Sequence, residues 1–428
     1  MIGEEHPADE QTGNRPGNRP ADSAPPAHDA YSALRVGDFR LFLSANFLAT
    51  LGEQMLAVAI GWELYVRTHS ALALGLVGLV QVLPVIVLAL PAGQLADRHD
   101  RRRIVLLTET VMALAALGLT ALSAGRGPLP VFYLCLLVLG AALAFNNPAN
   151  SSLVPQVVPE AAFRNAAAWS SSSWQLAAVI GPALGGALIA VTGYATLVYA
   201  FNVVTCAVVI GLVAAIRSRR VIVAPETASL ASLGAGVAFV RRTPVILAAI
   251  TLDLFAVLLG GAVTLMPIYA LDILHVGATG LGLLRAATSV GAVTMALVVA
   301  HRPPFLRAGR TLLVAVAGFG IATVVFGVSR LFPLSLLMLL LMGALDNISV
   351  VIRSTLLLTR APDEIRGRVY AVNGIFVGAS NELGGFESGV AAALLGPVLA
   401  VVAGGVGTLV VVAAVALLWP EMRRLSKL

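Results

Sequence analysis

Charged residues are scarce in this sequence. Only 12% of its 428 residues are Asp, Glu, Lys or Arg, whereas an ordinary soluble domain carries about 25%. The shortage excludes such a domain, and the mean hydropathy of +0.90 points the same way. The apolar residues form long unbroken runs, which favour membrane-spanning helices over the short alternating segments of a β-barrel.

Cysteine is also rare, and the common catalytic motifs are missing. Cys135 and Cys206 lie inside apolar runs, which excludes a disulfide framework and a zinc site, so we expect no metal. No HExxH, GxSxG or P-loop pattern occurs, so we expect neither an enzyme nor a cofactor. The net charge of +6 comes from arginines between apolar runs. They act there as topology signals, and no nucleic-acid partner is expected.

Twelve apolar runs separate at charged residues or at Pro and Gly. They cover 39–65, 71–95, 104–124, 131–150, 166–191, 195–216, 245–270, 277–300, 311–328, 333–358, 369–394 and 398–419. A helix needs about 20 apolar residues to cross a bilayer, and each run is close to that length. The expected fold class is an all-α membrane protein with twelve transmembrane helices.

The arginines predict the orientation of these helices. With the N-terminus in the cytoplasm, nineteen basic residues fall in cytoplasmic loops and at the C-terminus. Only Arg67, Arg126 and Arg330 fall on the opposite side. Cytoplasmic loops carry such an excess of basic residues. The sequence therefore predicts a multi-pass protein of a bacterial inner membrane with both termini in the cytoplasm.

The chain divides into two blocks of nearly equal length. We expect a disordered polar tail (1–37), a six-helix bundle (38–216), a linker with an amphipathic helix (217–243), a second six-helix bundle (244–420) and a cytoplasmic C-terminus (421–428). Two bundles related as parallel repeats are typical of secondary transporters. Because each half supplies its own bundle, a monomer is expected.

The loop between the second and third runs, GQLADRHDRRR, resembles the signature loop of the major facilitator superfamily. The matching residues are Gly93, Asp97, Arg98, Arg101, Arg102 and Arg103. Asp100 stands where that pattern has glycine. The resemblance implies the major facilitator fold and a cytoplasmic gate. In that gate Asp97 would lie beside Arg366 and Arg368 at the start of the eleventh span, where the positive helix end also attracts it.

The fifth run contains a second motif, GPxxGG. Its residues are Gly181, Pro182, Gly185 and Gly186. It resembles the motif of drug:proton antiporters in the same superfamily, although Ala168 and Ala177 replace two upstream glycines. Close helix packing explains the same residues equally well. The stretches DFRLFLSANFLATLGEQM, ALALGLVGLVQVLP, PDEIRGRV and ASNELGGFESG look like the branch of enterobactin-exporter-like and macrolide-efflux-like permeases. That resemblance implies proton-driven export of an amphipathic compound.

Ionisable residues inside the spans are the candidate functional groups, because burying a charge in a membrane is costly. The candidates for proton coupling or the cavity lining are Glu53, Asp346, Glu382, Glu387 and Asn46. A buried carboxyl group without a cation suits proton exchange. The candidates for buried charge pairs are Asp253, Arg285 and Arg353. Glu109, just beyond the arginine loop, is expected to pair with that loop.

The predicted function is proton-coupled efflux of an amphipathic small molecule, such as a drug, a macrolide or a siderophore-like compound, by alternating access. The expected partners are that small molecule, protons and the lipid bilayer. A lipid or lysolipid flippase on the same fold is the first alternative. A membrane sensor or scaffold that transports nothing is the second.

Overall fold

A computed structural model describes residues 31–217, 230–303, 305–362 and 365–426. Most of the predicted tail, 1–30, and residues 218–229 of the predicted linker lie outside this described part. The tail ends earlier than residue 37, because Ala33–Arg35 form a short 3-10 helix, η1. Ala33 is fully buried against the first bundle, and its N–H donates to Oδ1 of Asn165 at 3.2 Å.

The first half of the chain forms a bundle of six long helices. Its elements are α1 (Gly37–Thr68), α2 (Ala71–Arg98), α3 (Arg101–Ala124), α4 (Leu129–Ser151), α5 (Val154–Val157), η2 (Glu160–Ala162), α6 (Phe163–Thr192) and α7 (Thr196–Ala215). Capping residues set several of their ends. Oγ of Ser70 accepts the N–H of Ala73 at the start of α2. Asp100 caps α3 by accepting the N–H of Arg102, which gives this departure from the family pattern a structural role.

The second half forms a similar bundle, preceded by a helix from the linker. Its elements are α8 (Leu230–Arg242), α9 (Pro244–Leu259), α10 (Ala262–Ile268), η3 (Tyr269–Ile273), α11 (Gly277–Ala300), α12 (Ala308–Val328), α13 (Phe332–Arg360), α14 (Arg366–Leu395), α15 (Pro397–Leu418) and α16 (Pro420–Arg424). The predicted span 245–270 is not one helix, since it breaks at Gly260 and Gly261. At Gly261 a Cβ would lie 2.8 Å from the carbonyl oxygen of Gly384, so this break lets α14 approach closely.

Within the described residues, eleven helical segments are long and apolar enough to cross a membrane. The predicted span 369–394 is not among them, although it forms the 30-residue helix α14. Glu382 and Glu387 lower its hydropathy. Because α14 packs against α2, α9 and α15, we count it as the twelfth span. The all-α, two-bundle fold predicted from the sequence is confirmed.

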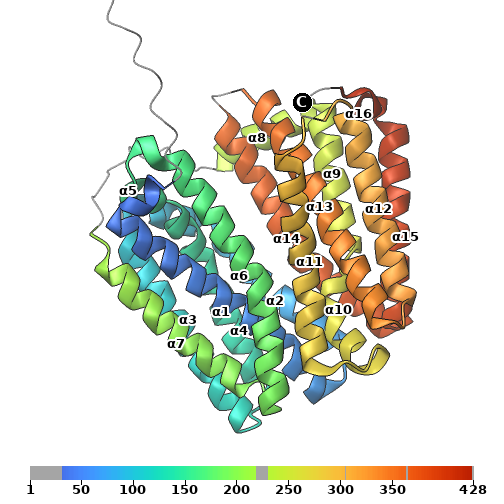
Figure 1. The fold of residues 1–428 in the computed structure, drawn as a ribbon. Helices are drawn as coiled ribbons and strands as arrows, with labels where there is room; N and C mark the ends of the chain where they lie inside the picture. The colour runs from blue at the N-terminus through green and yellow to red at the C-terminus, as the bar shows by residue number, and fades with distance from the viewer. Residues whose placement is uncertain (1–30, 218–229, 304, 363–364, 427–428) are drawn as a thin grey trace, which may run out of the picture.

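The two bundles touch at one end and diverge toward the end that carries α8, α16 and the C-terminus (Figure 1). Where they touch, α2 crosses α14 and α6 crosses α11. A Cβ on Gly75 would lie 2.9 Å from the Cα of Gly389, so the first crossing is a contact of backbone against backbone.

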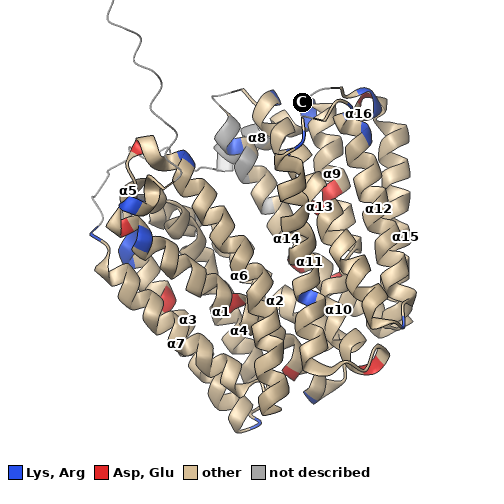
Figure 2. Ribbon diagram, viewed as in Figure 1, with Lys and Arg blue, Asp and Glu red and all other residues tan. Residues whose placement is uncertain are grey.

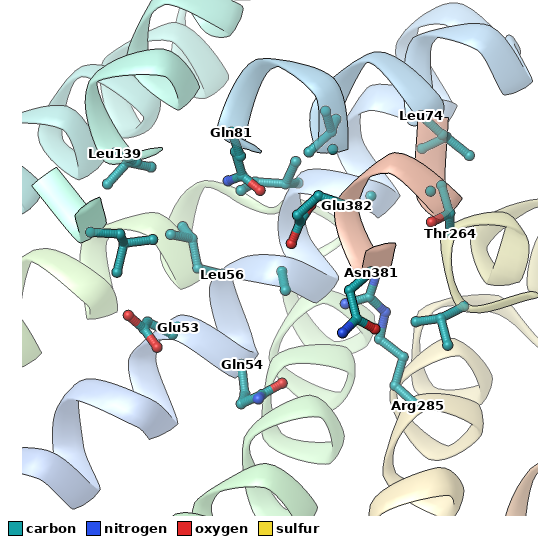
Figure 3. Close-up of a pocket in the computed structure, with 18 of the residues that line it drawn as sticks. Glu53, Gln54, Leu56, Leu74, Gln81, Leu139, Thr264, Arg285, Asn381 and Glu382 are labelled. Carbon is teal, nitrogen blue, oxygen red and sulfur yellow. The ribbon is translucent and has the colours of Figure 1, made fainter. Parts of the chain in front are cut away.

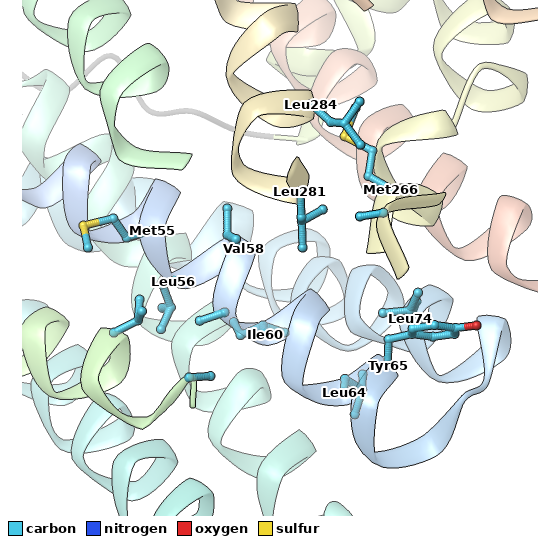
Figure 4. Close-up of a cluster of buried hydrophobic side chains, with 14 of the residues drawn as sticks. Met55, Leu56, Val58, Ile60, Leu64, Tyr65, Leu74, Met266, Leu281 and Leu284 are labelled. Atoms are coloured by element: carbon cyan, nitrogen blue, oxygen red, sulfur yellow. The ribbon is translucent and has the colours of Figure 1, made fainter. Parts of the chain in front are cut away.

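A buried apolar cluster fills the junction of the bundles. Val58, Ile60 and Leu64 of α1 belong to the same cluster as Leu281 and Leu284 of α11 (Figure 4). All five side chains are buried. Burial of a Leu or Ile side chain stabilises by roughly 1.5–3 kcal/mol relative to exposure to water, so exposing this cluster to water by separating the bundles here would be costly.

Candidate functional site

A cavity of about 430 Å³, with polar and apolar side chains in its wall, lies between the two bundles. Its wall includes Glu53 and Gln54 of α1, Gln81 of α2, Arg285 of α11 and Glu382 of α14 (Figure 3). The cavity is beside the apolar cluster, since Leu56, Ile60 and Leu74 belong to both. It therefore stands directly behind the closed end of the molecule.

Helical spacing explains why α1 supplies so much of this wall. The lining residues of α1 are Glu53, Gln54, Leu56, Ala57, Ile60 and Gly61. They recur every three or four residues, so they share one face of the helix. Opposite them, Gly78 of α2 lets α14 approach, because a Cβ there would lie 2.6 Å from the carbonyl oxygen of Glu382. This close crossing brings the Glu382 carboxyl group into the cavity.

Arg285 and Glu382 give the cavity one basic and one acidic group on the side of the second bundle. The Arg285 side chain extends from α11 toward α14, near Asn381 (Figure 3). Its Nε is buried and has no hydrogen-bond partner among the described residues. A buried donor without a partner costs about 1–3 kcal/mol. This nitrogen of Arg285 is therefore an unsatisfied donor in the wall of the cavity.

Glu53 also lines a second cavity, of about 190 Å³, inside the first bundle. Asn46, Glu109 and Asn146 line it as well. Nδ2 of Asn146 donates to Oε1 of Glu109 at 3.1 Å, and Nδ2 of Asn150 donates to Oδ1 of Asn46 at 2.5 Å. Glu53 thus stands between a cavity shared by both bundles and a cavity of carboxyl and amide groups.

The prediction that Glu109 pairs with the arginine loop is wrong. Its side chain points into the bundle, where one carboxylate oxygen accepts from Asn146 and the other has no partner among the described residues. Glu109 lies eight residues into α3, so the rotation of the helix aims it at α4 and not back at the loop. Its spacing from Arg101 gave no sign of this.

A third cavity, of about 300 Å³, lies between α6, α11 and α13, and Asp346 lines it. Trp174 lines both this cavity and the one that contains Glu109. Glu387 lines none of these three cavities, and Oγ of Ser388 donates to its carboxylate at 3.3 Å. The candidate acids therefore separate into three that line these cavities, Glu53, Asp346 and Glu382, and one, Glu387, that lines none of the three.

Asp253 of α9 and Arg353 of α13 form a buried ion pair. The two residues are 6% and 4% exposed. Arg353 is two helical turns from Asp346 on the same helix, but its guanidinium group pairs with the neighbouring helix. The pair fastens α9 to α13 and leaves Asp346 without this arginine.

Replacing Asp253 with Asn is expected to lower the free energy of unfolding by about 3 kcal/mol, because it leaves the Arg353 charge buried without its counter-charge. Thermal unfolding of the purified protein in detergent measures the loss. The double variant Asp253→Asn, Arg353→Gln should regain part of it. A single variant as stable as the wild type would show that the pair contributes little.

The arginines of the signature loop hold neighbouring helix ends in place. Arg101 donates to the carbonyl oxygen of Ser152 at 3.1 Å. Arg102 donates to the carbonyl oxygens of Val213 and Ala214 in the last turn of α7. The last carbonyls of a helix lack partners within it and attract positive charge, so Arg102 ties α3 to α7.

Other parts of the predicted gate are less constrained. Arg103 makes an exposed contact with Asp100 at 3.8 Å, and Arg98 and Arg368 are exposed. A Cβ on Gly93 would have nothing within 4 Å. The side chains of Asp97 and Arg366 lie outside the described part of the chain, so their contact stays a prediction.

The GPxxGG motif packs α6 against two different helices. A Cβ on Gly181 would lie 2.6 Å from Cβ of Gln54, and one on Gly185 would lie 3.1 Å from Cα of Met55, both on α1. Gly186 faces the other bundle instead, where its Cβ would lie 2.5 Å from the carbonyl oxygen of Ala278. Pro182 is buried between them. One motif thus serves both the inside of a bundle and the junction of the two.

This architecture defines a class of protein. Two helical bundles with a cavity between them that is closed at one end are the architecture of secondary transporters. Comparison with known proteins agrees. The chain belongs to the major facilitator superfamily, in the family of transmembrane secretion effectors, whose profile matches residues 28–426.

Individual relatives cover nearly the same length. The enterobactin exporter EntS of Citrobacter koseri is 29% identical over 397 residues, which is 90% of this chain and 92% of the exporter. The multidrug efflux pump Tap of Mycolicibacterium fortuitum is 29% identical over 364 residues, or 81% of this chain and 87% of the pump. The predicted family and branch are confirmed. The chain is a multi-pass secondary transporter of the branch that exports small molecules, and not an enzyme.

Solved structures show the same fold at low sequence identity. A bacterial homologue of the human lysosomal transporter Spinster, inward-facing and unoccupied, has a TM-score of 0.70 and 14% identity over 93% of this chain and 98% of its own. The nucleoside transporter NupG has a TM-score of 0.69 and 11% identity over 90% of this chain and 99% of its own. At these identities only the fold carries over.

Proposed function

We propose that this transporter is a monomeric, proton-coupled exporter of an amphipathic small molecule in a bacterial inner membrane, with both termini in the cytoplasm. The relatives named as an enterobactin exporter and a multidrug efflux pump favour export of such a compound. The observation that carries the proton coupling is the place of Glu53, which lines both the central cavity and the cavity of Glu109.

The proposed orientation follows the arginines. Basic residues gather mainly at the end that carries α5, α8 and α16, which is also the end where the bundles diverge (Figure 2). With that end in the cytoplasm, the apolar cluster closes the outer side of the molecule. The structure is then the state that takes up its substrate from the cell interior.

Glu53 suits a group that carries protons in exchange for substrate. An ionised carboxyl group in an apolar surrounding is costly unless a cation accompanies it. On its own helix, α1, the basic residues are Arg40, which is exposed near the start of the helix, and Arg67, whose guanidinium group is bound to Glu63. A proton on Glu53 removes the negative charge of its carboxyl group. Protonation would therefore change how strongly a charged substrate binds in the central cavity, and bound substrate would in turn change the proton affinity of Glu53.

A reconstituted system tests the proposal. Proteoliposomes with an acidic interior should accumulate a fluorescent amphipathic dye. The uptake occurs through those transporters whose cytoplasmic side faces the external solution. One-for-one exchange permits about tenfold accumulation per pH unit, because a tenfold ratio corresponds to about 1.4 kcal/mol. Collapsing the gradient with nigericin should remove the accumulation. Equal uptake with and without the gradient would contradict proton coupling, and movement of labelled lipid instead of dye would favour a flippase.

A further inference from the structure

The third cavity joins the two bundles at a place that the sequence motifs do not mark. Trp174 and Gln175 of α6 face Thr288 of α11 and Asp346 and Asn347 of α13 across a space of about 300 Å³. The walls thus come from both halves of the transporter. A solute held there touches surfaces that separate or close during alternating access.

The ionisable side chains of this region are all acidic. Asp346 is the one charged residue among those that line the third cavity. The adjoining cavity, which shares Trp174, is lined by Glu53 and Glu109. Among their described lining residues the two cavities hold three carboxyl groups and no Lys, Arg or His. Arg353, on the same helix as Asp346, is paired with Asp253. A positive charge beside Asp346 therefore does not compete with Arg353 for this carboxyl group.

Polar atoms around the third cavity also lack partners. Oδ1 of Asn347 and Oγ1 of Thr288 are buried and form no hydrogen bond within the described part of the chain. Native structures leave few such atoms, and each calls for an explanation. Both atoms are oxygens that carry a negative partial charge, so both can stabilise a cation beside Asp346.

Trp174 adds an aromatic surface to this group. Its side chain is 58% exposed although it lies near the middle of α6, and it lines both acidic cavities. The face of an indole ring attracts cations by about 0.5–2 kcal/mol, and more strongly away from water. A large, open aromatic side chain between carboxyl groups is the arrangement that binds an organic cation.

We infer that the cavity of Trp174 and Asp346 binds the positively charged group of the substrate, and that the substrates of this exporter include lipophilic organic cations. The inference rests on the proposed export function and narrows its substrate class. Asp346 supplies the counter-charge, Trp174 the aromatic surface, and Asn347 and Thr288 the oxygens that face the cation.

Two probes of the same shape and opposite charge test the inference. Tetraphenylphosphonium and tetraphenylborate are titrated into the purified protein in detergent by isothermal calorimetry. The wild type should bind the phosphonium at least tenfold more tightly than the borate. Asp346→Asn should weaken phosphonium binding at least tenfold and leave borate binding unchanged or stronger, whereas Asp346→Glu should keep most of the preference.

Matched variants separate binding from damage to the fold. Glu63→Gln, which removes a buried carboxyl group outside all three cavities, should leave phosphonium binding unchanged. Trp174→Ala should weaken it severalfold and Trp174→Phe much less; these variants keep the test valid if Asp346→Asn does not fold. Equal affinity for the two probes, or a phosphonium affinity that Asp346→Asn does not change, would overturn the inference. Phosphonium binding without gradient-driven transport would instead contradict proton coupling and leave this site standing.

Discussion

Replacing Glu53 with Gln is expected to reduce transport driven by a pH gradient at least 100-fold, while exchange of substrate across the membrane continues. Glutamine keeps the size of the side chain and its capacity for hydrogen bonds but cannot release a proton. Because Glu53 lines both the central cavity and that of Glu109, the substitution would break the link between proton and substrate without filling either space.

The same proteoliposomes measure both quantities. Gradient-driven accumulation of the dye reports coupling, and counterflow of labelled against unlabelled dye at equal pH reports movement through the cavity. Glu63→Gln is the matched control on α1. After the Glu63 carboxylate is removed, Arg67 still donates to the carbonyl oxygens of Leu122 and Gly127. Loss of both activities in Glu53→Gln would indicate a structural role, and wild-type accumulation would exclude Glu53 as the coupling group.

The sequence could identify the polar residues of the cavities but not all of their partners. Glu53 and Glu382 stand out in apolar runs, where a carboxyl group is costly. Asp253 and Arg353 stand out equally, but their pairing depends on how α9 and α13 are rotated against one another. Asp346 and Arg353 are seven residues apart on α13, a spacing that places them on one face of the helix. A contact between helices, which no spacing reveals, directs Arg353 to Asp253 instead.

The fold was predictable in its elements and less so in its irregularities. Apolar runs of about 20 residues are a strong signal for spans, and the helices follow them. The break at Gly260 and Gly261 is weaker as a signal, because a pair of glycines inside an apolar run also occurs in straight packed helices. The hydropathy of α14 is low partly because the helix contains Asn381 and Glu382. Both residues line the central cavity, so the polar groups of the candidate site weaken the signal for this span.

Replacing Gly186 with Val is expected to force the two bundles apart at the closed end and to reduce transport at least 100-fold. A Cβ at this position would lie 2.5 Å from the carbonyl oxygen of Ala278 and 2.9 Å from Cα of Gly282. Both are backbone atoms of α11, so no change of side-chain rotamer relieves the contact. The crossing of α6 and α11 must open, and the state in which the closed end is sealed becomes inaccessible.

Distances between the bundles measure this effect directly. Spin labels at Tyr194 and His275, both exposed near the closed end, should move apart by several ångströms in Gly186→Val, after Cys135 and Cys206 are replaced. Gly211→Val is the control, because a Cβ at Gly211 of α7 has nothing within 4 Å. Gly181→Ala makes the contrast complete: its Cβ would contact Gln54 inside the first bundle, so it should lower stability and leave the distance unchanged. If Gly186→Val kept both the wild-type distance and wild-type transport, the closed end would not depend on this crossing. If Gly186→Val instead lowered stability and left the distance unchanged, as expected for Gly181→Ala, the motif would act only in packing within the first bundle. A contact within one bundle that moves as a rigid body cannot change the balance between the two arrangements of the bundles.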